Sequence, residues 1–262
     1  MSTPLRPAAA YLTSASITSS LKVELRRLTR SGLGLGVLVG FAFFGLSGPV
    51  LSIYMPEILG AAASTDQLAI SASQATPADA ISLFNQSAMQ LGLIVTVAVA
   101  ITSIGWDTRP GSSIFYRTRV HRLSTVLLPR LIIDWLIALA TYSCGLLLAV
   151  VVTASAIGHP PAGMVIRTWM ACGLYIVMAM SIGHLIAASL RRTTTAIALT
   201  TLLALVLPVM NQVPGTSHWV PTALLLPTGL HAMPVVVSLV VTGLCAVGSV
   251  LIARRQTLRR DA

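Results

Sequence analysis

Few side chains within the long apolar segments of this chain could do chemistry. Asp134 and His184 are the main ionisable residues there, and Arg130 stands four residues before Asp134. Residues four apart share one face of a helix, so Arg130 and Asp134 can form an ion pair. An ionisable residue inside a membrane helix indicates a functional site by default. We interpret the Arg130–Asp134 pair as structural rather than as a proton relay. For His184, a functional site and a satisfied packing residue are equally supported.

Motifs of common hydrolytic sites are missing from the sequence. Lys22 is the only lysine and no glycine-rich loop precedes it, so the phosphate-binding GxxxxGK[ST] motif is absent and ATP hydrolysis is excluded. The histidines form no HExxH pair, and no serine lies in a GxSxG turn. Cys144, Cys172 and Cys245 all lie within apolar segments and are interpreted as small packing residues. We therefore expect no catalytic residue, no metal site and no cofactor bound by this chain.

Six long apolar runs must position these residues. They are Leu33–Ile53, Met89–Trp106, Leu131–Thr153, Trp169–Leu190, Ala196–Met210 and Val235–Ala253. A bilayer core about 30 Å thick needs roughly 20 helical residues, and all runs except the fifth approach that length. The chain is 55% hydrophobic and 9% charged, with a mean hydropathy of +0.85. This composition predicts an all-α polytopic membrane protein with six transmembrane helices in a single domain over residues 17–262.

The basic residues lie on one side of the predicted membrane. Of the 17 Lys and Arg residues, all except Arg167 fall before run one, between runs two and three, between runs four and five, or after run six. This asymmetry predicts that both termini are cytoplasmic. We assign the net charge of +10 to topology and to contact with anionic membrane lipid, not to nucleic acid. Abundant arginine and alanine suggest a bacterial origin, and hence the bacterial inner (cytoplasmic) membrane.

The N-terminal region is predicted to have two parts. Residues 1–16 are rich in proline and alanine and are expected to be disordered, without the apolar core of a cleaved signal peptide. Over residues 17–30, leucine and isoleucine recur at helical spacing, while Glu24, Arg26 and Arg27 occupy other faces. This pattern predicts an amphipathic helix lying in the cytoplasmic interface of the membrane. A charged extension of the first span is the alternative.

Local motifs add detail to three of the spans. Thr76 as N-cap, a proline directly after it and Asp79 in the first turn predict that the second span begins outside the membrane. Before the last span, the proline-interrupted stretch Asn211–Pro234 is too broken for a regular crossing helix and predicts a re-entrant outer segment. In the first span, Gly36-x-x-x-Gly40 is a weak indication of a close helix contact.

The order of these elements resembles the permease subunits of bacterial type-2 ABC exporters. The shared features are the interfacial helix, six spans, a long loop between spans two and three, a basic turn after span four and a broken segment with Trp219 and Pro221 before the last span. The closest local match is Asp107-x-x-x-Gly111-Ser112, where the family often has an acidic residue, three residues and Gly-Thr. The chain departs from the family in having Asp where Glu is usual.

The resemblance implies a division of labour between subunits. In the family, the loop between spans two and three forms a coupling helix in a cleft of the ATPase. Here it carries over to Asp107, Gly111, Ser112, Arg117 and Arg119. The resemblance also implies a partner ATP-binding-cassette subunit, which binds ATP and Mg²⁺, and a second permease, identical or related. On this interpretation the chain itself is not an enzyme.

The expected substrate path runs between the two permeases. Its lining is predicted from polar residues of spans two and five, namely Thr96, Thr102, Thr200 and Thr201. The substrate class is hydrophobic or amphipathic: a drug, antibiotic, lipid or peptide. Two alternatives stay open, an integral-membrane enzyme acting on lipid and a non-transporting membrane anchor or immunity protein. An enzyme should concentrate carboxylates or histidines near one leaflet, whereas the cytoplasmic loops here offer mainly arginine.

Overall fold

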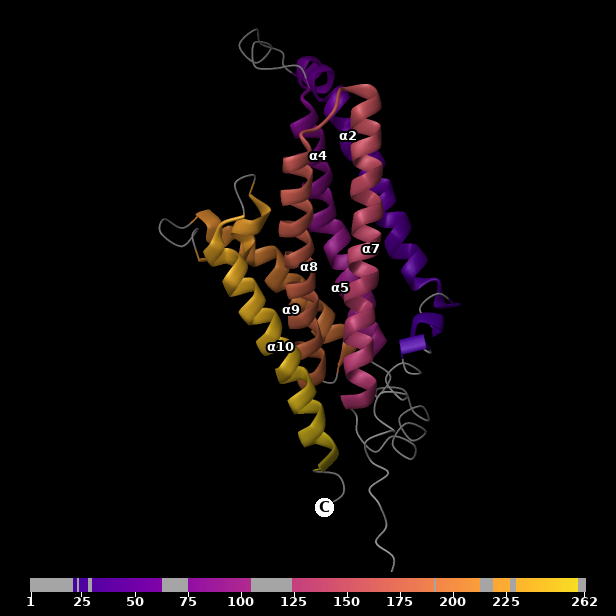
Figure 1. Ribbon diagram of the computed structural model, residues 1–262, viewed down its shortest axis with the longest axis vertical. Helices are drawn as coiled ribbons and strands as arrows, with labels where there is room; N and C mark the ends of the chain where they lie inside the picture. Colours follow the sequence, from indigo (N-terminus) through magenta and orange to yellow (C-terminus); the bar gives the residue numbers. More distant parts are fainter. Residues whose placement is uncertain are drawn as a thin grey trace, which may run out of the picture.

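The structure, a computed structural model, consists of helices joined by turns. It describes residues 21–22, 24–27, 30–62, 75–104, 124–190, 192–212, 219–226 and 230–258. No strand occurs over this part of the chain, which confirms the predicted all-α class. Six helices are long and apolar enough to cross a membrane, as predicted, and they form an elongated bundle (Figure 1). The architecture is that of a multi-pass membrane protein.

The helices extend beyond the apolar runs that predict them. They are α2 (Leu33–Ala62), a continuous second span of α4 (Pro77–Ser87), η1 (Ala88–Gly92) and α5 (Leu93–Ile104), then α7 (Ser124–Ala156), α8 (Ala162–Leu190), α9 (Thr193–Val206) and α10 (Ala232–Leu258). At 1.5 Å per residue, α2, α7 and α8 are each about 43 to 50 Å long. This exceeds the thickness of a bilayer core of about 30 Å, so these helices project past it.

The second span starts as its sequence predicts. The backbone N–H of Asp79 donates to Thr76 Oγ1 at 3.2 Å, and the backbone N–H of Thr76 donates to Asp79 Oδ2 at 3.1 Å, which forms a reciprocal capping box. Further along, the span contains a π-helical turn, η1, that was not predicted. There the N–H of Leu93 donates to the carbonyl of Ala88, five residues earlier. One extra residue is thereby accommodated in the middle of the span.

The fifth span is completed by a change of helix type. The 14 residues of α9 cover about 21 Å, and the 3-10 helix η3 (Leu207–Gln212) adds about 12 Å, enough together to cross a bilayer core. Pro208 has no backbone N–H to donate within an α-helix, which favours the change. A second 3-10 helix, η4 (Pro221–Leu225), precedes α10, and Thr222 on it donates to Asn211 Oδ1 at 2.9 Å. The chain thus passes from an α-helical span into two short 3-10 helices before α10.

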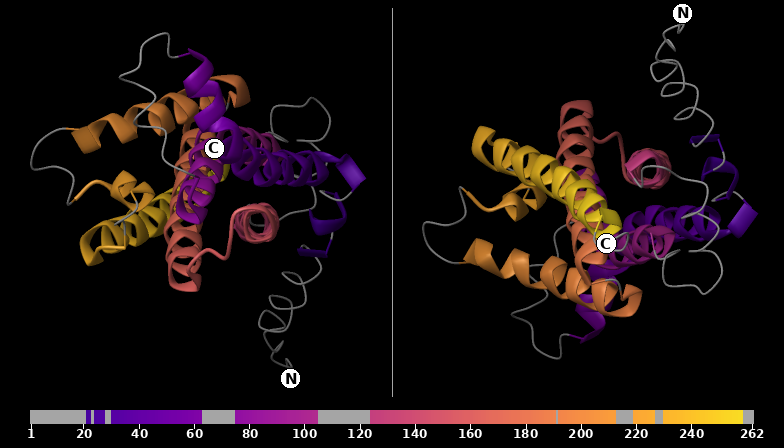
Figure 2. Two further views of the ribbon diagram at one scale, coloured as in Figure 1. Left: turned by 90° about the horizontal axis from the view of Figure 1, so that it is seen from above. Right: turned by 90° about the horizontal axis from the view of Figure 1, so that it is seen from below.

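Helix α8 forms the centre of the bundle. It contacts α5, α7, α9, α10 and η4, while α2 packs on α4 and α7 (Figure 2). The apolar stretch of α8 is 67% buried, against 11% for α9 and 17% for α10, so the last two are peripheral. On the α2 side, the Tyr142 ring meets Phe41 edge-on at 5.8 Å and stacks on Phe84 at 5.9 Å between centroids.

Two glycines allow α2 and α7 to cross closely. A Cβ atom added at Gly145 would lie 2.7 Å from the carbonyl oxygen of Phe41, and one added at Gly45 would meet the carbonyl oxygen of Gly145. Both positions therefore require the smallest side chain. By contrast, nothing lies within 4 Å of an added Cβ at Gly36 or Gly40. The close contact in the described part of α2 is thus one to two turns beyond the motif that the sequence suggests.

Replacing Gly45 by alanine should weaken this crossing. We expect Gly45→Ala to lower the free energy of unfolding by about 1–3 kcal/mol relative to Gly40→Ala, the usual cost of overpacking. Both variants gain the same helix propensity, about 1 kcal/mol, so their difference isolates the clash with Gly145. The measurement is the fraction of monodisperse protein left after heating in detergent. Equal stability of the two variants would show that α2 and α7 separate without cost.

Candidate functional site

Charged side chains gather at one end of the bundle. This is the end where α2, α7 and α9 begin and where α10 finishes, and we call it the basic end, at the bottom of Figure 1. The gathered residues, here named the charge cluster, are Glu24, Arg27, Ser103, Arg130, Asp134 and His184. All except Arg27 are buried. They come from the N-terminal segment and from α5, α7 and α8, so four separate parts of the chain meet here.

Glu24 is held between two arginines. Its Oε1 accepts from Arg27 Nη1 at 2.8 Å, and its Oε2 accepts from Arg130 Nε at 3.2 Å. The side chains of Glu24 and Arg130 are only 6% and 2% exposed, so solvent screens their attraction little. The sequence pattern gave no reason to bury Glu24, whereas the neighbouring Leu25 is half exposed. The ion pair therefore fastens the N-terminal segment to α7.

The N-terminal segment approaches this site as a separate helical piece. Its described residues, 21–22, 24–27 and 30–31, are helical, in agreement with the predicted helix. Gly32 then adopts a φ of +71°, a left-handed conformation that side chains disfavour, before α2 starts at Leu33. This break separates the direction of the segment from that of α2. It allows Glu24 to turn toward α7.

A second group of contacts surrounds Asp134. Ser103 Oγ donates to Asp134 Oδ2 at 2.7 Å, and His184 Nε2 lies 3.3 Å from the same oxygen. Among the described residues, neither ring nitrogen of His184 has a partner in hydrogen-bond geometry, so this contact is a close approach and not a hydrogen bond. Arg27 connects the two groups, because its Nη1 also donates to the backbone carbonyl of Ser103 at 3.3 Å. The cluster therefore links α5, α7 and α8 to the N-terminal segment.

The predicted Arg130–Asp134 neighbours thus contact different parts of the molecule. They lie four residues apart on α7, but Arg130 reaches Glu24, which is 106 residues away in sequence, and Asp134 reaches α5 and α8. Arg130 has further interactions besides this pair. The interpretation of both residues as structural stays a prediction. Local spacing does not reveal that the contacts of both residues are with other elements and not along α7.

The predicted coupling residues lie outside the described residues. These are Asp107, Gly111, Ser112, Arg117 and Arg119. The described chain stops at Ile104 and resumes at Ser124, and both ends of this loop belong to the basic end. Ser103 stands directly before Ile104, and Arg130 follows Ser124 by six residues. Each end of the loop therefore leads straight into the charge cluster.

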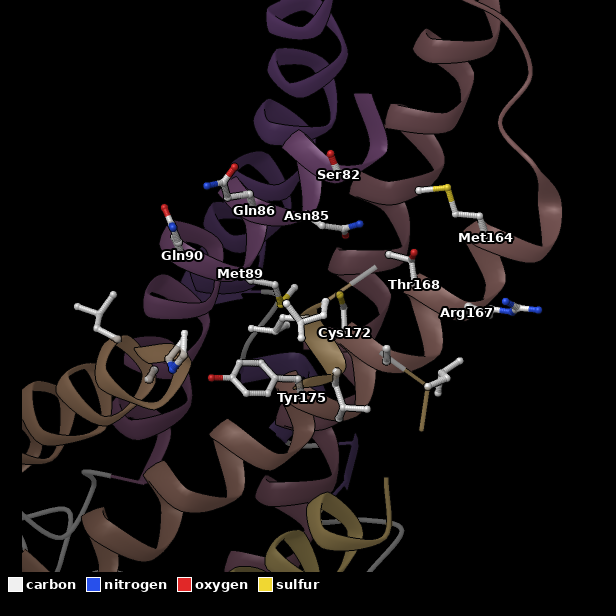
Figure 3. A pocket seen from close by; sticks show the side chains of 18 of the residues that line it. Ser82, Asn85, Gln86, Met89, Gln90, Met164, Arg167, Thr168, Cys172 and Tyr175 are labelled. Atoms are coloured by element: carbon white, nitrogen blue, oxygen red, sulfur yellow. The ribbon is translucent and has the colours of Figure 1, made fainter. Parts of the chain in front are cut away.

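A cavity of about 770 Å³ lies in the opposite half of the bundle. Figure 3 shows side chains that line it. It is bounded by the second span, α8, the end of α9 and η4. Residues that line it include Ser82, Asn85, Gln86, Met89, Gln90, Met164, Arg167, Thr168, Cys172, Tyr175, Leu205, Pro208 and Leu224. Its volume falls within the range of small-molecule sites. The sequence analysis missed this cavity; the polar residues Ser82, Asn85 and Gln86 shortly before the apolar run that starts at Met89 are the sequence signal that could have indicated it.

None of the four predicted path residues lines this cavity. Thr96 and Thr200 are buried, and each donates at 2.7 Å to a backbone carbonyl four residues earlier in its own helix. Thr102 is exposed and likewise bonds within its helix, while Thr201 is half-buried. The cavity does take residues from the same two spans, nearer their other ends. The role of these threonines in a path stays a prediction.

Removing the Glu24 carboxylate should destabilise the basic end. Removal of one partner from a buried ion pair costs about 3–5 kcal/mol of stability. We expect the loss in Glu24→Ala to lie near the lower value, because Arg130 keeps other interactions. The matched control is Glu57→Ala, which removes an exposed carboxylate from α2. Thermal unfolding of the purified variants in detergent measures the difference. Coincident melting curves would contradict the stabilising role of Glu24.

Neither a scan of the sequence against protein-family models nor a search of curated proteins finds a match. Within the described residues, no group of three His, Cys, Asp or Glu side chains could hold a metal ion. The geometry of the charge cluster and of the cavity therefore carries the functional argument.

Proposed function

We propose that this chain is the permease subunit of an ATP-driven exporter of the type-2 ABC class in a bacterial cytoplasmic membrane. It forms the transmembrane path for a hydrophobic or amphipathic substrate, and a separate ATP-binding-cassette subunit binds Mg²⁺ and hydrolyses ATP. The observation that carries the proposal is the charge cluster. It joins both ends of loop 105–123 to the N-terminal segment and to the central helix α8.

This arrangement suits a protein that receives force through that loop. A displacement of the loop moves the last turn of α5 and the first turns of α7. Ser103 and Asp134 then carry the displacement toward His184 on α8, while Arg130 carries it to Glu24. Such contiguous buried contacts can bias a two-state helix bundle, provided that ATP binding favours one state. Because α8 contacts α9 and α10, the movement reaches the peripheral helices as well.

The proposal also explains the peripheral helices and the distribution of charge. Leu202 on α9, and Leu239 and Leu244 on α10, face outward and are each more than half exposed. In the proposed assembly such faces contact lipid or the second permease, which is identical or related. The basic end then faces the cytoplasm by the positive-inside rule, and η4 belongs to the re-entrant segment Asn211–Pro234 in the outer leaflet.

Affinity purification tests directly whether a separate ATPase subunit binds this chain. When the tagged chain is expressed in its native host and purified in mild detergent, an ATP-binding-cassette subunit should co-purify in comparable amount. Mass spectrometry of the eluate identifies it, and an unrelated six-span protein carrying the same tag is the control. If the chain elutes without such a subunit, the exporter proposal is rejected.

Substitution in the loop tests where the ATPase docks. Asp107→Arg combined with Gly111→Arg places two bulky cations in the proposed coupling turn, so ATPase capture should fall at least about tenfold. Thr194→Arg is the matched control, because it adds a cation at the same end of the bundle on an exposed position. Recovery of each variant in the membrane fraction shows that it still inserts. Unchanged capture and ATP-dependent transport in the double variant would contradict the placement of the coupling loop.

A further inference from the structure

The cavity has one polar wall that is rich in hydrogen-bond donors. Asn85 on α4 and Thr168 on α8 both line it, and Tyr175 lies about two turns beyond Thr168 on α8 (Figure 3). Tyr142 donates its hydroxyl to Asn85 Oδ1 at 2.9 Å, and the amide nitrogen of Asn85 carries two N–H donors besides. Gln86 and Gln90 add further amides.

The Tyr175 hydroxyl points to a ligand. The residue is only 1% exposed, yet its hydroxyl forms no hydrogen bond with any residue that the structure describes. Thr168 likewise bonds to no described residue, although many hydroxyls in these helices donate to their own backbone. Buried polar groups are nearly always hydrogen-bonded. Tyr175 is buried and Thr168 is half-buried, and both line the cavity, so their hydroxyls are open to a ligand inside it.

The charge of the cavity lining is positive. Arg167 is exposed and extends from α8 at the rim, and no described acidic residue lines the cavity. Arg167 also forms no ion pair with any other residue in the described part of the chain. It is the one basic residue on its side of the predicted membrane, where basic residues are avoided. A guanidinium at the rim of a cavity lined by neutral donors favours a carboxylate or phosphate group.

The remaining walls are apolar and adaptable. Met89 and Met164 contribute flexible side chains, and Leu224, Leu225 and Leu226 close the side formed by η4. Methionine fills irregular space and adjusts to differently shaped ligands. The same cavity therefore offers a donor-rich wall for a head group and an apolar wall for a hydrocarbon body. The turn η1 contributes Gln90 to the polar wall and Met89 to the apolar wall, and π turns often occur at functional sites.

We infer that the cavity binds an anionic amphiphile, with Arg167 as the charge partner of its head group and Asn85, Thr168 and Tyr175 as hydrogen-bond donors. The hydrocarbon body lies against Met89, Met164 and η4. A phosphate of a phospholipid and a carboxylate of a fatty-acid-like molecule share this chemistry. If the chain is an exporter permease, as proposed above, this amphiphile is its substrate, and that assignment rests on the proposed function. Binding to the cavity does not, because it requires no ATPase.

Equilibrium binding to the purified full chain tests the inference. The protein is placed in phosphatidylcholine nanodiscs, and binding of radiolabelled dodecyl phosphate is measured after subtraction of empty nanodiscs. We expect Arg167→Gln to raise the dissociation constant about tenfold and Tyr175→Phe to raise it about threefold to tenfold. Arg192→Gln, which removes an exposed charge at the basic end, is the matched control and should bind like the original chain.

Competition with unlabelled molecules shows which parts of the ligand are needed for binding and whether its head group is a phosphate or a carboxylate. Dodecanol lacks the charge and inorganic phosphate lacks the body, so neither should displace the probe at concentrations where unlabelled dodecyl phosphate does. Stronger displacement by lysophosphatidylglycerol assigns a phospholipid, and stronger displacement by dodecanoate assigns a carboxylate. Equal displacement by dodecanol, or an unchanged dissociation constant in Arg167→Gln, would overturn the inference. Binding without a co-purifying ATPase would reject the exporter proposal while leaving this site intact.

Discussion

A carboxylate that is buried in a helix bundle must be compensated, and in this chain that requirement organises one whole end of the molecule. Glu24 meets it through Arg27 and Arg130, which lie on different elements. Since an ion pair of this kind gains little net energy against the cost of removing both groups from water, its main effect is on geometry. It determines how the N-terminal segment approaches α7, and through Ser103 and Asp134 it also positions the ends of α5 and α8.

The span architecture was predictable because its causes are local. Hydrophobic length determines which segments cross a bilayer, and the residues around Thr76 carry their own helix-start signal. Run boundaries were less accurate, since α7 continues for seven residues before Leu131 and includes Pro129 within the helix. A polar residue ends an apolar run, but it does not end a helix that still has backbone partners.

The partners of Arg130 and the walls of the cavity could not be predicted in the same way. Spacing along one helix identifies neighbours such as Asp134, but a partner such as Glu24 becomes visible only when the helices are arranged in space. The same applies to Gly45 and Gly145, whose importance depends on where two backbones cross. Asn85 and Tyr175 lie on different spans, and only the packing of α4 against α8 brings both to one cavity.

The wide turn η1 has a consequence for the phase of the second span. An α-helix advances by about 100° per residue, so an extra residue held in one wide turn keeps the two halves of the span in register. If this turn wound as regular α-helix, everything beyond Leu93 would rotate by about 100° relative to everything before Ala88. Ser103 would then face away from Asp134 while Asn85 kept its place. The single turn η1 therefore sets the rotation of one half of the second span relative to the other, and with it which residues face the charge cluster and which face the cavity.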